Sequence, residues 1–280
     1  GFVITLYGDL RGMRLLLISM AALYATATLI HYRFLRDIDV LQETEDKAGY
    51  NSISIRSIAG FFKETYATIP GTLRALPTSL KALAGVIVLS FMANGVASPF
   101  WVVYATEEVG LSSAAWGLVL LIEAALRLAL FIPAGMIVDR WGRTKTLLAS
   151  LILALFVIPS FVFVSGFASA LMIRCAVAVS FAMAMTACTS LMADTVPRRL
   201  RGQVMSALGQ GSIWIGPAGG GTSGPSVGYV AAIPLVISSL LGGILYTWSS
   251  VLPWVFVFCT TLLSILLIVF FIGDPQEAEV

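Results

Sequence analysis

Long apolar segments occur seven times in this chain of 280 residues and constrain its fold more than any other feature. Hydrophobic residues make up 58% of the sequence and charged residues only 11%, whereas a soluble domain carries about 25% charged residues. An apolar segment of roughly 20 residues is long enough to cross a hydrocarbon core of about 30 Å as a helix. The segments are continuous rather than alternating, which favours helices over a β-barrel. We therefore expect an all-α, polytopic membrane protein with seven transmembrane helices.

The expected spans follow one another with short connections, apart from two longer intervals. In chain order they are 13–30, 82–104, 114–138, 146–164, 168–193, 227–246 and 251–272. The longest interval, between the first two spans, contains Ile55, Ile58, Phe62 and Tyr66 at helical spacing, which predicts a helix lying on the membrane surface. A solvated linker is the alternative interpretation of that segment.

Basic residues gather in alternate connections, and this pattern predicts the orientation of the chain because Lys and Arg accumulate in short cytoplasmic loops. The basic residues of these connections are Arg33, Arg36, Lys47, Arg56, Lys63, Arg74, Lys81, Arg140, Arg143, Lys145, Arg198, Arg199 and Arg201. The opposite connections contain no Lys or Arg. Only Arg11 and Arg14, before the first span, depart from the pattern. We expect the N-terminal edge outside and the C-terminus in the cytoplasm, in a protein of the plasma membrane.

Two charged turns lie between these spans. The first contains Gly135, Asp139, Arg140, Gly142, Arg143 and Lys145 in the pattern G-x-x-x-D-R-x-G-R. The second, after the fifth span, contains Asp194, Pro197, Arg201 and Gly202, the last three in the pattern P-x-x-x-R-G. Both turns, in this order, resemble those of the major facilitator superfamily, whose members have two halves of six helices. The resemblance extends over essentially the whole chain.

This resemblance implies a domain organisation in which the first span is the last helix of a front half. Residues 1–34 would be that helix, 35–81 a cytoplasmic linker with its interfacial helix, and 82–280 the six-helix back half. The chain opens on Gly1, so we expect that the native protein is longer and that the missing N-terminal half is a partner of these residues.

The first turn has a predicted structural and gating role. Gly135 and Gly142 would allow close helix approach and a tight turn. The carboxylate of Asp139 would face backbone N–H groups or guanidinium groups, as a latch that holds one state of the transport cycle. The basic side chains would anchor the loop, and an anchor without a gating role is the alternative. Thr144 departs from the family pattern, which often has a basic residue directly after Gly-Arg, and Lys145 is the residue that could take its place.

Glu123 and Arg127 are the main candidates for transport chemistry. They lie four residues apart in the middle of the third span, on one helical face. A lone charge at the bilayer centre costs about 2.5 to 3.5 kcal/mol on insertion scales, so the two should face each other or an aqueous cavity. Proton binding to Glu123 would then release Arg127 for an anionic substrate or another carboxylate. A static ion pair that supports helix packing is the alternative.

Two further polar residues are candidates for substrate or coupling contacts. Arg174 lies close enough to the outer end of the fifth span for its side chain to reach the surface, so we expect membrane anchoring rather than substrate contact. Asn94, followed by Gly95 and Pro99, combines a buried amide with residues that loosen a helix, and polar contact between helices is the alternative. The glycine-rich segment 216–225 cannot be a regular helix and is expected to be a flexible or family-specific insertion.

The function that these features predict is a secondary active transporter that moves a small solute across the lipid bilayer by alternating access, with proton coupling as a hypothesis. A seven-helix receptor or sensor is the alternative class. His31 is the only histidine, and the three cysteines have no metal-site spacing, so we expect neither an enzyme nor a cofactor or metal site. No nucleic-acid partner is expected.

Overall fold

The computed structural model describes residues 7–34, 77–196, 204, 207–209 and 228–273. The chain divides into two compact units, Gly1–Pro70 and Gly71–Val280. The described part of the first unit is helix α2, Asp9–Phe34, whose side chains are nearly all exposed. The expected interfacial helix, the residues Pro197, Arg201 and Gly202 of the second turn, and the segment 216–225 lie outside the described residues.

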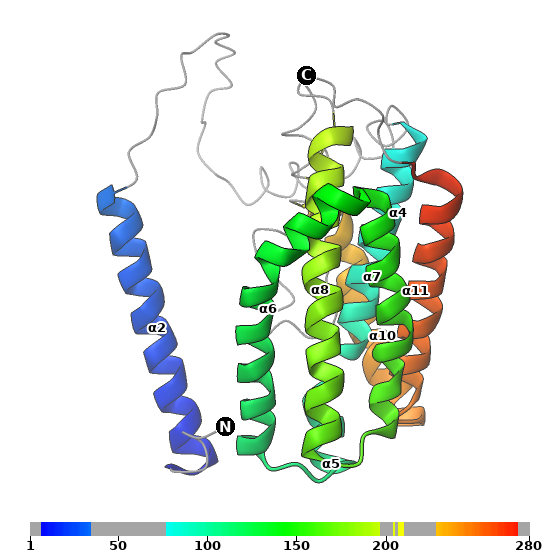
Figure 1. Cartoon of the computed structure of the whole chain (residues 1–280). Helices are drawn as coiled ribbons and strands as arrows, with labels where there is room; N and C mark the ends of the chain where they lie inside the picture. Colours follow the sequence, from blue (N-terminus) through cyan, green and yellow to red (C-terminus); the bar gives the residue numbers. More distant parts are fainter. Residues whose placement is uncertain (1–6, 35–76, 197–203, 205–206, 210–227, 274–280) are drawn as a thin grey trace, which may run out of the picture. The chain divides into compact units, whose positions relative to one another are not determined.

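The second unit is a bundle of helices that lie side by side (Figure 1). Its elements are α4 (Thr78–Ala97), α5 (Phe100–Glu107), α6 (Ser113–Trp141), α7 (Arg143–Val157), the 3₁₀ helix η1 (Pro159–Phe163), α8 (Phe167–Thr195), α10 (Tyr229–Trp248) and α11 (Leu252–Phe271). Helix α8 packs against α6 and α7, whereas α4 packs against α10 and α11. Helix α7 also meets α11, so the two groups of helices form one bundle.

All seven expected spans are confirmed as helices that are long and apolar enough to cross a membrane. The second expected span is two helices, because α4 ends at Ala97 and α5 begins at Phe100. Pro99 has no N–H to donate to the preceding turn, which interrupts the helical hydrogen bonding there. The fourth expected span similarly combines α7 with η1, and Pro159 stands at the start of η1.

Local sequence signals account for the ends of α6. The hydroxyl of Ser112 accepts a hydrogen bond from the Ala115 N–H at 3.2 Å and caps the start of the helix. At the other end, Gly142 has a φ of 91°, a backbone conformation that residues other than glycine rarely adopt. Pro133 lies inside α6, and the helix bends along its length in Figure 1.

An aromatic cluster fills one end of the bundle core. The ring of Trp101 lies 4.5 Å from that of Phe161 and 4.6 Å from that of Trp254, between ring centroids. The Tyr104 hydroxyl donates a hydrogen bond to the Val162 carbonyl oxygen at 2.9 Å. These contacts connect α5, η1 and α11, so the short helix α5 is held by large buried rings.

Helices α4 and α10 approach each other through small residues. A Cβ atom at Gly242 would lie 2.6 Å from the backbone oxygen of Val96, and one at Gly95 would lie 2.2 Å from the Ser238 hydroxyl. Helix association in a membrane depends on such close van der Waals packing because lipid is as apolar as the side chains that it would replace. The neighbouring Gly243 has no described atom within 4 Å of its Cβ position.

We expect Gly242→Ala to destabilise the protein by about 1 to 3 kcal/mol, because the added methyl group must push α4 and α10 apart. Gly243→Ala is the matched control on the same helix and should be neutral or slightly stabilising. Thermal unfolding of the full-length protein in detergent measures the difference. Equal melting temperatures for the two variants would contradict the close packing of α4 on α10.

Candidate functional site

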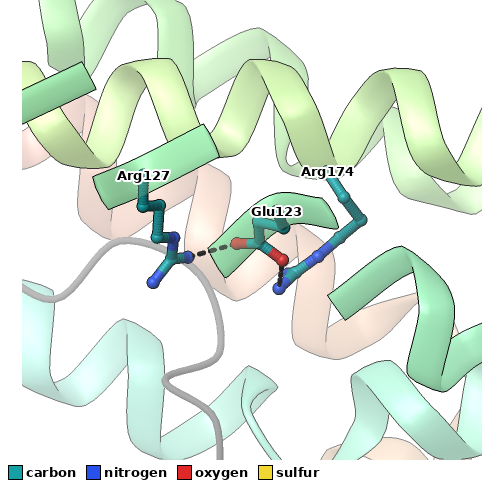
Figure 2. Close-up of polar contacts among 3 residues, drawn as sticks. All are labelled: Glu123, Arg127 and Arg174. Atoms are coloured by element: carbon teal, nitrogen blue, oxygen red, sulfur yellow. Dashed lines mark ion pairs between the residues drawn. The ribbon is translucent and has the colours of Figure 1, made fainter. Parts of the chain in front are cut away.

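A buried carboxylate lies between two arginines from two helices. Glu123 in α6 is 2% exposed, and its Oε1 forms an ion pair with Arg127 one turn further along the same helix. Its Oε2 forms a second ion pair with Arg174 of α8 (Figure 2). The predicted proximity of Glu123 and Arg127 is thus confirmed, and Arg174 joins them in what we call the charge network.

The expectation that Arg174 reaches the membrane surface is wrong. Its side chain is 0% exposed, and its guanidinium carbon lies 4.5 Å from the ring centroid of Trp101 and 5.7 Å from that of Trp116. Arg174 is close enough to the end of its helix for its side chain to reach the surface, but the side chain points into the bundle instead. There the carboxylate of Glu123 and the faces of two indole rings replace the water that a buried cation loses.

Arg127 has a different environment from Arg174. Its guanidinium carbon lies 4.2 Å from the ring centroid of Phe181 in α8, and its side chain is 13% exposed. Phe181 lies two helical turns from Arg174, so α8 supplies both Arg174 and the ring that contacts Arg127. Trp116 is on the same helical face as Glu123, as the spacing in α6 indicates.

The charge network carries two formal positive charges and one negative charge at the described residues. Glu123 is the only carboxylate that the described residues place between the two guanidinium groups. Removal of one member of a buried ion pair is costly because the remaining charge stays away from water. The ion pair between Glu123 and Arg174 therefore holds α6 and α8 together.

The first turn has the tight geometry that was expected. The Gly142 N–H donates to the Val138 carbonyl oxygen at 3.0 Å, and the Thr146 hydroxyl donates to the Gly142 carbonyl oxygen at 2.8 Å. Arg140 and Lys145 are exposed, as an anchoring role requires. The close helix approach expected at Gly135 is absent, since no described atom lies within 4 Å of its Cβ position.

An ion pair joins the two turns, but Asp139 is not its acidic member. Arg143, at the start of α7, pairs with Asp194 in the last turn of α8. Asp139 is exposed, and among the described residues none forms an ion pair with it. The sequence indicated both turns as functional but gave no sign that Arg143 and Asp194 meet, because they lie on different helices.

Asn94 lies apart from the charge network. It is buried in α4, four residues before the break at Ser98, and it lines a pocket between α4, α7 and α11. The expected combination of a buried amide and an interrupted helix is confirmed. Among the described residues, no group of three His, Cys, Asp or Glu side chains is close enough to bind a metal ion.

Comparison with protein families identifies the chain. The model of the Major Facilitator Superfamily matches residues 83–280. The chain belongs to the major facilitator superfamily. A comparison with curated proteins finds no match. The matched residues contain the charge network and both turns, which confirms the resemblance seen in the sequence and shows an integral membrane protein of a transporter superfamily.

We expect Glu123→Leu to lower stability more than Arg127→Leu does. The first change leaves two cations without their shared carboxylate, at a cost of about 3 to 5 kcal/mol for a broken buried pair. The second leaves Glu123 paired with Arg174, and the lost side chain is partly exposed. Thermal unfolding of the full-length protein in detergent compares them, and the reverse ranking would contradict the central position of Glu123.

Proposed function

We propose that this superfamily member is a secondary active transporter that moves a small solute by alternating access and couples transport to protons at Glu123. One observation carries the proposal: a buried carboxylate pairs with an arginine of its own helix and with an arginine of a second helix, within the matched region. Ionisable groups inside a membrane domain are costly and commonly mark proton or substrate pathways. The receptor alternative has the number of spans and the expected outside N-terminus in its favour.

The proposed coupling step is the addition of a proton to the Glu123 carboxylate. The neutral acid attracts both guanidinium groups more weakly, so Arg127 can turn toward an anionic solute or another carboxylate. Arg174 remains enclosed by Trp101 and Trp116, which makes Arg127 the more mobile arginine. Loss of the proton restores both ion pairs and displaces the solute from Arg127.

We further propose that residues 82–280 are the back half of the transporter, after a linker at 35–81 and the last helix of a front half at 1–34. The order of the two charged turns supports this division. The solute site would then lie between the halves, as in other transporters built from repeats. The distribution of Lys and Arg favours a cytoplasmic C-terminus in the plasma membrane.

The ion pair between Arg143 and Asp194 is the proposed latch. It joins the start of α7 to the end of α8 at the ends that carry the charged turns. The pair is partly exposed, so its net contribution to stability should be modest, and it can open during a transport cycle without a large cost. A weak contact of this kind suits a gate that opens in each turnover.

We expect Glu123→Gln to abolish solute accumulation driven by a pH gradient while solute exchange continues, because the amide cannot carry the proton. The full-length protein would be reconstituted into liposomes, with its solute identified by ligand-induced thermal stabilisation. Glu108→Gln, an exposed position next to α5, is the matched control. Undiminished accumulation by the Glu123→Gln variant would disprove coupling at this residue.

We expect Arg143→Asp and Asp194→Arg to shift the conformational equilibrium singly and to restore it when combined. Each single variant places like charges together, and the double variant rebuilds the pair with reversed polarity. Accessibility of a cysteine introduced on the side of the charged turns measures the shift. Asp139→Asn serves as the control, and a double variant no better than its parents would argue against the latch.

A further inference from the structure

A second polar site lies inside the bundle, apart from the charge network. A cavity of about 30 Å³ opens between α4, α7 and α11. Its polar lining consists of the Asn94 amide and the hydroxyls of Ser90, Thr260, Thr261 and Ser264. None of its lining residues is an acid or a base. Trp101 lines the cavity and also stacks on Arg174, so one ring contacts both sites.

The amide of Asn94 is without a hydrogen-bond partner among the described residues. Its side chain is 5% exposed, and neither Oδ1 nor Nδ2 is hydrogen-bonded. A buried amide that makes no hydrogen bond is strongly disfavoured, and more so inside a bilayer, whose hydrocarbon core supplies no water. The amide needs a donor at Oδ1 and an acceptor at Nδ2, and a group that both donates and accepts can serve each atom.

Three of the four neighbouring hydroxyls already donate elsewhere. Ser90 donates to the Ile87 carbonyl oxygen, Thr260 to those of Phe256 and Val257, and Ser264 to that of Thr260. Their hydroxyl hydrogens are thus used within their own helices, while their oxygens still have lone pairs directed elsewhere. The cavity therefore offers several acceptors on α4 and α11 around one amide.

We propose that this cavity binds a pair of water molecules that connect Asn94 of α4 to Thr261 and Ser264 of α11. A cavity holds a water molecule once it exceeds about 10 to 15 Å³ and supplies two to four polar partners, so this cavity has room for about two. Water donates to the hydroxyl oxygens and to Asn94 Oδ1, and it accepts from Asn94 Nδ2. A monovalent cation would satisfy the oxygens but would leave the Nδ2 hydrogens unpaired.

The test is radiolytic hydroxyl-radical footprinting of the full-length protein in detergent, which oxidises side chains next to bound water. Trp101 and Trp254 are both buried, at 2% and 0% exposed, and their rings touch, but only Trp101 lines the cavity. We expect Trp101 to be oxidised several-fold faster than Trp254. In Asn94→Leu, which removes the amide, the Trp101 rate should fall to that of Trp254.

A second variant keeps the proposal testable if Asn94→Leu does not fold. Thr261→Val keeps the side-chain shape and removes one proposed water partner, so it should lower the Trp101 rate. Thr189→Val is the control, because that hydroxyl bonds within α8 and lies outside the cavity lining. Equal oxidation of Trp101 and Trp254 in the unmodified protein, or a Trp101 rate that neither variant lowers, would overturn the proposal. Thermal stabilisation by sodium but not by choline, lost in Asn94→Leu, would overturn it in favour of a cation site.

Discussion

The compensation of charge at Glu123 is the constraint on which the described bundle depends most. A carboxylate in the bilayer needs positive partners within reach, and here they come from its own helix and from α8. This requirement fixes which faces of α6 and α8 meet, because rotating either helix about its axis would bury an unpaired charge. Since α8 also packs on α7, the position of the first charged turn follows from the same contact.

Properties that depend on local sequence could be predicted. The spans follow from the thickness of the hydrocarbon core, and the pairing of Glu123 with Arg127 follows from their spacing on one helix. The inward direction of Arg174 could not be predicted, because both lipid headgroups and a partner carboxylate satisfy an arginine near a helix end. The choice between them depends on which face of α8 meets α6, and the uniformly apolar faces of these helices do not indicate it.

The same reasoning explains two other differences from expectation. The charged turns offer Arg143 two carboxylates, Asp139 and Asp194, and only the packing of α7 on α8 makes Asp194 the partner. The break between α4 and α5 was concealed by a continuous apolar run, although Pro99 marked it. Asn94 could be recognised as a polar residue in a span. Its cavity could not, because three helices form it and the sequence of any single helix does not indicate it.

The charge network also limits how the sequence can change over evolutionary time. Replacement of Glu123 alone leaves two buried arginines together, whereas replacement of one arginine alone leaves Glu123 paired with the other. A loss of Glu123 that avoids unpaired charges must therefore be accompanied by the loss of both arginines, and a fully apolar set can pack as well as the ionic one. Related chains that lack Glu123 should also lack both arginines, and Trp101 and Trp116 should be free to change only in those chains.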